Sequence, residues 1–260
     1  MSLNCPDLLC CESSSTVFSG NREDYSLEYS SDLESPPPDG EESIAGLLED
    51  ERDPARISFN FNSQSINASA RSESVVWILK VQRFFGFQPL TAYLAVNYFD
   101  RFIFSHHTPK MCGWALQLLS IACLSLAAKM EEPLVPSLLD LQVEGANFIF
   151  EPRTVQRMEL HVLRLLDWRL RSISPFCYLR FLALKIDPTG TYTEFLITRA
   201  NEIILSTIKE KNVFEYRPSC IATTAILCAA NDTPKFSYIT AQHAESWFDG
   251  LHKVRKKIMN

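Results

Sequence analysis

Glycine is scarce in this sequence, which has 8 glycines among 260 residues and only 5 of them after residue 55. Phosphate-binding loops depend on glycine, because a backbone without Cβ atoms lets a phosphate approach the peptide groups closely. Neither G-x-G-x-x-G nor G-x-x-x-x-G-K-[ST] occurs, and the zinc-protease pattern H-E-x-x-H is absent as well. We therefore predict that the chain is not an enzyme and binds no cofactor.

Metal-ligand spacing is also missing. The eight cysteines include no C-x-x-C pair, and the nearest approach to a metal pattern is His106, His107 and Cys112, which we interpret as a loop and a helix start. The first residues do not resemble a secretory leader, so we expect reduced thiols and no metal site. The adjacent Cys10 and Cys11 leave three interpretations open: a metal ligand, a disulfide partner or a docking motif.

Positive charge is nearly absent from the first part of the chain. Residues 1–55 contain 14 Asp and Glu but 2 Lys and Arg, whereas the remainder contains 17 acidic and 23 basic residues. This acidic segment, rich in Ser and Pro, has too little apolar surface to offset the entropy lost on ordering. We predict a disordered tail over 1–55, with a short helix near Ile44–Leu48. Ser35-Pro36 fits a phosphosite, a degradation signal or a solvated linker.

The rest of the chain is predicted to be all-α, because apolar residues recur at helical spacing and no period-2 alternation persists. Proline or glycine separates most of the segments. The longest apolar run, WALQLLSIACLSLAAKM at 114–130, contains Gln117, two serines and a terminal lysine, which favours a buried helix over a membrane span. The predicted helices cover 71–85, 90–103, 111–130, 136–142, 152–168, 175–184, 191–208 and 217–230.

Two of these helices share a small-residue pattern. Ala127-Ala128-Lys129 recurs as Ala229-Ala230-Asn231, 102 residues later. Small residues let neighbouring helices approach closely, so each run is expected at the centre of a helical bundle. We therefore predict two tandem bundles, over 56–171 and 172–260.

Two charges lie where apolar residues are expected. On a helical wheel, Glu159 lies at the edge of the apolar face of 152–168, and Lys129 ends the most apolar helix of the chain. An ionised carboxylate in such a place has to be paired or has to face a partner protein. Periodicity alone favours the first interpretation, in which Glu159 meets Lys129 or a nearby arginine within the fold.

Four long segments contain family motifs. They are RSESVVWILKVQRFFGFQPLTAYLAVNYFDRFIFS (71–105), LSLAAKMEEPLVPSLLDL (124–141), RMELHVLRLLDWRL (157–170) and LRFLALKIDPTGTYTEFLITRANEIILSTIKE (179–210). With these segments the chain resembles a plant D-type cyclin. The resemblance covers about 65–250 and implies two tandem cyclin-fold bundles of five helices each. It also implies a regulatory subunit that activates a cyclin-dependent Ser/Thr kinase and promotes G1/S entry.

The resemblance also assigns roles to particular residues. The lysine of A-A-K-x-E-E and the glutamate of R-M-E are implied kinase contacts, and they are Lys129 and Glu159 here. The resemblance therefore favours the interpretation in which both charges face a partner protein. Apolar kinase contacts are implied for Leu126, Trp168 and Leu170. A structural ion pair is implied for Arg71 and Asp100.

The spacing L-x-C-x-E favours the docking-motif interpretation of Cys10 and Cys11. In an extended chain alternate side chains share one face, so Leu8, Cys10 and Glu12 point together while Cys11 points away. This pattern resembles the retinoblastoma-pocket docking motif near the start of D-type cyclins, although a chance match with surface thiols is the alternative. The implied partners are an A-type cyclin-dependent kinase, a retinoblastoma-related protein and kinase inhibitor proteins, with no membrane and no direct nucleic acid contact. The implied location is the nucleus, with the cytoplasm as a second site.

Some segments depart from the family pattern. The substrate-docking patch that begins M-R-x-I-L in many cyclins has Glu73 and Ser74 in place of its apolar pair, although Trp77 remains, and 54–65 matches the expected preceding helix poorly. The chain ends at HKVRKKIMN, so we expect an incomplete second bundle and low solubility. The alternative function is a cyclin-fold transcription factor that binds DNA or polymerase components, for which KVRKK at 253–257 would be the basic segment.

Overall fold

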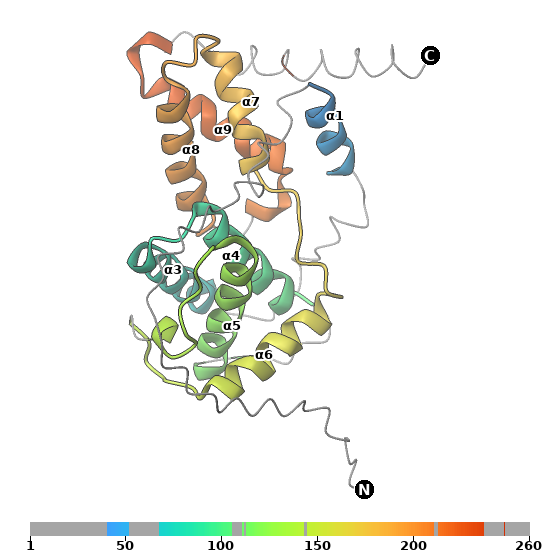
Figure 1. Ribbon diagram of the computed structural model, residues 1–260, viewed down its shortest axis with the longest axis vertical. Coiled ribbons are helices and arrows are strands. Elements are labelled where there is room, and N and C mark those ends of the chain that lie inside the picture. Colours follow the sequence, from blue (N-terminus) through green and yellow to red (C-terminus); the bar gives the residue numbers. More distant parts are fainter. Residues whose placement is uncertain are drawn as a thin grey trace, which may run out of the picture. The chain divides into compact units, whose positions relative to one another are not determined.

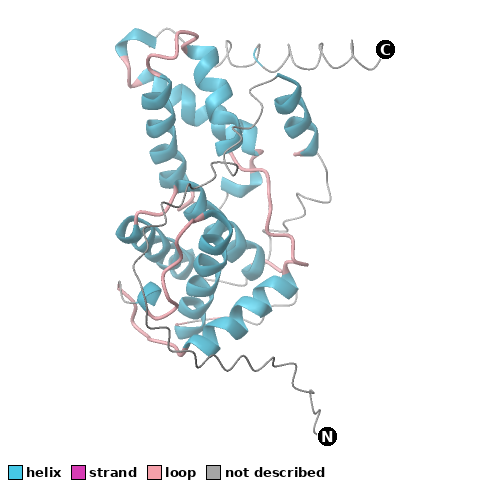
Figure 2. Cartoon of the chain, viewed as in Figure 1, coloured by secondary structure: helices cyan, strands magenta, loops and turns pink. Residues whose placement is uncertain are grey.

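The computed structural model describes residues 41–51, 68–105, 111, 113–142, 145–210, 213–236 and 247. Contacts divide the chain into two units, 1–36 and 37–260, and every described residue lies in the second. Helices joined by loops make up this described part, and it contains no strand (Figure 2). The all-α prediction is therefore confirmed for these residues.

The first bundle consists of α3 (Ala68–Phe85), α4 (Pro89–Ile103), α5 (Trp114–Glu131) and α6 (Pro152–Leu165), with the short 3-10 helix η1 (Asp140–Gln142) between the last two. Proline at the first position of α4 and α6 fits there because that position has no intrahelical N–H bond to lose. Helix α5 packs against α3, α4 and α6 (Figure 1).

Helix α5 is long and apolar enough to cross a membrane by composition, but most of it is buried inside the bundle. Of its two internal serines, Ser120 donates through Oγ to the Leu116 carbonyl at 2.8 Å, whereas the fully buried Ser125 Oγ has no hydrogen-bond partner in the described part of the chain. The prediction of a buried core helix is confirmed.

The second bundle consists of α7 (Phe176–Ile186), α8 (Thr193–Thr207) and α9 (Pro218–Asn231), with the 3-10 helices η2 (Val213–Glu215) and η3 (Pro234–Phe236). Helix α9 packs against α7 and α8 (Figure 1). Ala127, Ala128, Ala229 and Ala230 have no exposed surface. This burial confirms that the repeated small-residue runs lie on the central helix of each bundle. The predicted incompleteness of the second bundle concerns residues that lie mostly outside the described ones.

Several predicted helices are shorter than expected, and two of them have a clear local cause. Only η1 forms within 136–142, where Ser137 Oγ donates to Asp140 Oδ2 at 2.6 Å and accepts from the Asp140 N–H at 3.2 Å. Side-chain bonds of this kind compete with regular helix bonds. Helix α6 ends at Leu165 instead of 168, because Asp167 and Trp168 both have positive φ, 52° and 60°.

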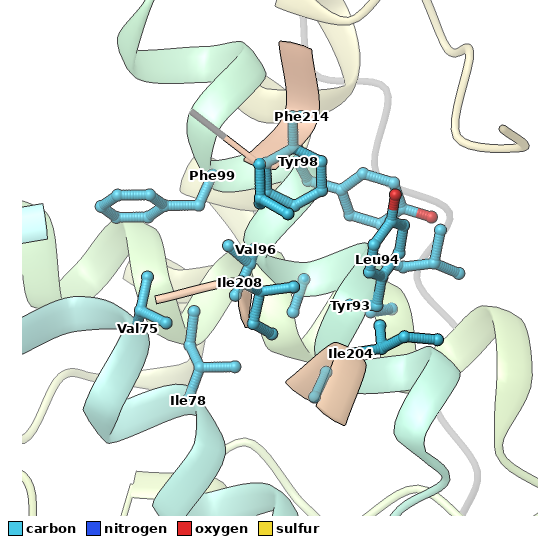
Figure 3. Packing of buried hydrophobic residues seen from close by; sticks show 14 of the residues in the cluster. Val75, Ile78, Tyr93, Leu94, Val96, Tyr98, Phe99, Ile204, Ile208 and Phe214 are labelled. Atoms are coloured by element: carbon cyan, nitrogen blue, oxygen red, sulfur yellow. The ribbon is translucent and has the colours of Figure 1, made fainter. Parts of the chain in front are cut away.

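The two bundles share one hydrophobic core. Helix α4 contacts α8, and the Tyr93 ring of α4 lies 5.6 Å from Phe176 and 5.2 Å from Phe214 between ring centroids. Figure 3 shows side chains of the two bundles in this cluster, among them Val75, Ile78, Tyr93, Leu94, Val96, Tyr98, Phe99, Ile204, Ile208 and Phe214. Continuous apolar packing of this kind opposes independent movement of the bundles.

Part of the acidic segment is folded, although we predicted disorder through residue 55. The short helix expected near Ile44–Leu48 is present as α1 (Glu41–Asp50), and Ile44, Leu48 and Glu51 are buried. The Glu51 carboxylate accepts from Tyr178 Oη at 3.1 Å, from the Ser219 N–H at 3.1 Å and from Ser219 Oγ at 2.5 Å. Composition could not reveal this order, because the acceptor lies 127 residues from Tyr178 and 168 residues from Ser219.

Glu51 caps α9 from outside that helix. The Ser219 N–H is in the first turn of α9, where backbone donors lack intrahelical acceptors and negative charge is favoured by the helix dipole. Burial, with the Glu51 charge as the next cause, raises the pKa of Tyr178 above its ordinary value, so its hydroxyl remains a donor.

We expect Glu51→Ala to lower the free energy of unfolding by about 2–3 kcal/mol, since it removes a charged acceptor from buried donors. Chemical denaturation followed by circular dichroism measures this effect. Glu210→Ala, the same change at an exposed acid without a side-chain hydrogen bond, is the matched control and should stay within about 0.5 kcal/mol of the wild type. Equal stability of both variants would contradict the capping role.

Candidate functional site

The two charges singled out by periodicity form an ion pair with each other. Lys129, in the last turn of α5, donates through Nζ to both carboxylate oxygens of Glu159 in α6 at 2.7 Å. The Lys129 side chain is 44% exposed, whereas that of Glu159 is 8% exposed. The pair is therefore anchored in the bundle on its acidic side and open to solvent on its basic side.

This geometry combines the two interpretations of the sequence. The residues meet within the fold, as periodicity favoured, and the lysine remains accessible. An ammonium group has three N–H donors, and the pair uses two of them. The remaining donor, at an exposed head group that is also favoured by the C-terminal dipole of α5, is available to an acceptor on another molecule.

Large apolar side chains are exposed in the segments that carry this ion pair. Leu134, three residues beyond α5, is 84% exposed, and Trp168, just beyond α6, is 65% exposed. Isolated exposed apolar residues are ordinary, but several of them in the segments that carry an anchored charge are typical of a protein-binding surface. We call the following set the apolar rim: Met130, Leu134, Leu160 and Trp168.

The three residues for which the resemblance implied apolar contacts differ in accessibility. Trp168 is exposed, whereas Leu126 and Leu170 are buried in the core. The Leu170 carbonyl also accepts from Tyr98 Oη of α4 at 3.0 Å. In the free chain, Leu126 and Leu170 thus contribute mainly to packing beneath the surface on which Trp168 lies.

The backbone at Trp168 is held in a conformation that side chains rarely adopt. Each left-handed non-glycine residue costs about 1–2 kcal/mol, and Asp167 and Trp168 are both left-handed. Two hydrogen bonds hold the turn. The Trp168 N–H donates to the Leu163 carbonyl at 2.9 Å, and the Arg101 side chain donates through Nη1 to the Arg169 carbonyl at 2.7 Å. Strain of this kind is concentrated at functional sites, and neither periodicity nor composition indicated it.

Glu132 has a role that the sequence reasoning missed. Adjacent acids at the end of a helix are ordinarily solvated, but Glu132 Oε1 accepts from the Gln88 N–H at 2.7 Å and also from the Thr91 hydroxyl. It therefore caps the start of α4 and ties down the segment that follows Lys129. The partly buried Glu131 has a pKa above its ordinary value, first because of burial and also because of the Glu132 charge.

Arg71 and Asp100 form a buried bidentate ion pair. Arg71 Nε and Nη2 donate to the two Asp100 oxygens at 2.8 and 2.7 Å, and the side chains are 3% and 2% exposed. Arg71 also donates to the Ile208 carbonyl at 3.1 Å and the Lys209 carbonyl at 2.8 Å, at the end of α8. One side chain of the first bundle thus caps a helix of the second.

The remaining sequence predictions concern the docking motif, the altered substrate patch and metal ligands. Leu8, Cys10 and Glu12 lie outside the described residues, as does 54–65. At the altered substrate patch, Ser74 is buried and donates to the Ala70 carbonyl, Glu73 accepts from Ser69 Oγ, and Trp77 is half-buried. Within the part of the chain that the structure describes, no group of His, Cys, Asp and Glu could hold a metal ion.

Comparison with known proteins gives the same architecture. The family model "Cyclin, N-terminal domain" matches residues 44–171, and "Cyclin, C-terminal domain" matches 173–254. An X-ray structure of a viral cyclin from herpesvirus saimiri superposes with a TM-score of 0.66 over 80% of this chain and 88% of that chain, at 15% identity. The described helices therefore have the cyclin fold, the fold of non-catalytic regulatory subunits.

Sequence relatives specify the group. The chain is 54% identical to Cyclin-D1-1 of Arabidopsis thaliana, over 96% of this chain and 73% of that protein. It is 50% identical to Cyclin-D2-1 of rice (Oryza sativa subsp. japonica), over 73% of this chain and 58% of that protein. This chain belongs to the cyclin family, in its plant D-type group. Membership confirms the resemblance seen in the sequence and implies the role of a cyclin-dependent kinase regulator.

Proposed function

We propose that this chain binds and activates an A-type cyclin-dependent kinase through the Lys129–Glu159 pair and the apolar rim. The observation that supports this most directly is a solvent-accessible ion pair, buried on one side, in segments that also expose large apolar side chains. Such a surface combines the buried anchors and oriented charge of a protein interface.

Activation would follow from differential binding. A kinase exchanges between inactive and active arrangements, and a partner that contacts the active arrangement more strongly shifts the population toward it. The rigidity of the surface favours this role, since Glu132 fixes the segment after Lys129 and backbone bonds fix the turn at Trp168. A preorganised surface loses little entropy on binding.

A second part of the proposed function is substrate recruitment. Leu8, Cys10 and Glu12 would dock a retinoblastoma-related protein, while the folded bundles hold the kinase. The support is the L-x-C-x-E spacing in an acidic segment of a D-type cyclin. Tethering raises the effective concentration of a substrate, up to about the millimolar range for a suitable linker. We propose that this acts in the nucleus, with the cytoplasm as a second location, and promotes G1/S entry.

One reconstitution separates the two parts. The chain, an A-type kinase and a retinoblastoma-related protein are mixed, and phosphorylation is followed for that protein and for histone. We expect Cys10→Ala with Glu12→Ala to abolish capture of the retinoblastoma-related protein and to slow its phosphorylation about 10-fold or more, because tethering is lost. Histone phosphorylation should remain at the wild-type rate.

The control variant changes two acidic-segment residues that lie outside the motif, Ser13→Ala with Ser14→Ala. Loss of histone phosphorylation in the Cys10 and Glu12 variant would contradict independent tail and kinase functions. If the wild-type chain leaves the kinase inactive toward both substrates, kinase activation itself is wrong. Specific DNA binding under the same conditions would favour the transcription-factor alternative.

A further inference from the structure

Three arginines lie together where the chain leaves the first bundle. Arg101 is in the last turn of α4, and Arg169 and Arg171 follow α6. Arg101 Nη1 donates to the Arg169 carbonyl at 2.7 Å. We call Arg101, Arg169 and Arg171 the arginine cluster.

The positive charge of the arginine cluster is only partly compensated by nearby acids. None of the three guanidinium groups forms an ion pair in the described part of the chain. The pKa of Arg101 is below its ordinary value, mainly because of burial and also because of the Arg169 charge, and nearby Asp167 offsets this only in part. Glu131, the acid that interacts with Arg171, has a pKa raised mainly by burial.

Most donors of the arginine cluster are unused. A guanidinium group has five N–H donors in a planar fork that matches carboxylate or phosphate oxygens. Arg101 uses one donor in the structure, and no side-chain bond is made by Arg169 or Arg171, both of which are exposed. The cluster therefore combines a partly compensated positive charge with donors that are mostly unused within the described part of the chain.

The arginine cluster is continuous with the proposed kinase surface. Trp168 of the apolar rim directly precedes Arg169, and the bond from Arg101 to the Arg169 carbonyl helps to hold the left-handed turn. Tryptophan and arginine are the residues most enriched at energetically dominant positions of protein interfaces. Because the cluster adjoins the proposed kinase surface, the kinase is the partner that would contact it.

We propose that the arginine cluster binds an anionic segment of the kinase, through carboxylate or phosphate oxygens, beside the Trp168 contact. This inference rests on the proposed function and adds the chemistry of the partner segment. The contact would guide the kinase onto the ion pair, because surface charge mainly changes association rates.

The test compares two double variants in association kinetics with an A-type kinase. Arg169→Gln with Arg171→Gln removes two charges of the cluster and retains Arg101, which holds the turn. Arg83→Gln with Arg217→Gln removes two charges from exposed arginines of α3 and of the segment before α9 that make no side-chain bond. Association is measured by stopped-flow fluorescence at about 50 mM and about 500 mM salt, because screening is strong at the higher concentration.

We expect the cluster variant to associate about 3- to 10-fold more slowly than the wild type at low salt and nearly equally at high salt. The control variant should differ from the wild type by less than about 2-fold. Phosphatase treatment of the kinase identifies the anion: if the difference disappears, a phosphate is bound, and if it persists, carboxylates are bound.

Two failures are distinguishable. If the cluster variant associates like the wild type at both salt concentrations, or if the control variant is slowed equally, the arginine cluster has no specific role. If the wild-type chain does not bind the kinase at all, the proposed function itself is wrong.

Discussion

Replacing Glu159 with alanine should weaken kinase binding by about 30-fold or more, with little activation left at concentrations that saturate the wild type. Removing one partner of a desolvated, hydrogen-bonded charge pair at an interface costs about 2–5 kcal/mol, and every 1.4 kcal/mol is about tenfold in affinity. In this chain the loss also releases Lys129, because Glu159 accepts both of its described hydrogen bonds. Isothermal titration with an A-type kinase measures the change.

Further variants separate a binding defect from a folding defect. Lys129→Met retains the apolar stem of the exposed lysine and should weaken binding by about 10-fold or more. Because this change leaves the buried Glu159 carboxylate without its cation, circular dichroism is used to verify that the variant is folded. Glu194→Ala, at an exposed acid of α8 without a side-chain bond, is the matched control. Wild-type affinity in a folded Lys129→Met variant would contradict a kinase contact at this pair, whatever Glu159→Ala does.

Replacing Arg71 with alanine should lower the free energy of unfolding by about 3–5 kcal/mol. The change removes the cation from a carboxylate that is 2% exposed, and breaking a buried pair on one side costs about this much. It also removes two donors from the Ile208 and Lys209 carbonyls at the end of α8. Urea denaturation followed by circular dichroism gives the change, and a second transition would show that the bundles no longer unfold together.

A double-variant cycle tests the pair itself. Arg71→Met with Asp100→Leu replaces both charges with apolar side chains, which is often far less destabilising than removal of one charge. We expect the double variant to be clearly more stable than the sum of the single changes predicts, with a coupling energy of about 1–3 kcal/mol. Additive effects, or an Arg71→Ala variant within about 1 kcal/mol of the wild type, would show that the pair contributes little to stability.

Much of the fold followed from local pattern. The helical segments were predictable because the spacing of apolar residues determines which face of a helix can be buried, and this spacing is a local property. The prediction was least accurate at the ends of helices. Helix α6 stops at Leu165 although its apolar pattern continues, since a tertiary bond from Arg101 and backbone bonds of the turn hold Asp167 and Trp168 in the left-handed region.

The candidate site was only partly predictable. Lys129 and Glu159 were identifiable, since a charge beside an apolar face needs a partner, and periodicity favoured a partner within the fold. The structure gives that internal partner, but periodicity could not show that the lysine remains exposed. The capping role of Glu132 was not predictable, because its donors at Gln88 and Thr91 are more than 40 residues away.

The sequence by itself determined that this chain is helical, that two small-residue helices lie at the centres of two bundles, and that its motifs are those of a plant D-type cyclin. Only the tertiary structure decided which distant groups meet: Glu51 with Ser219, Arg71 with the end of α8, and Arg101 with the turn at Arg169. The physical reason is that periodicity encodes how a segment faces its core over a few residues. The partner of a buried charge depends on how segments far apart in the chain pack together.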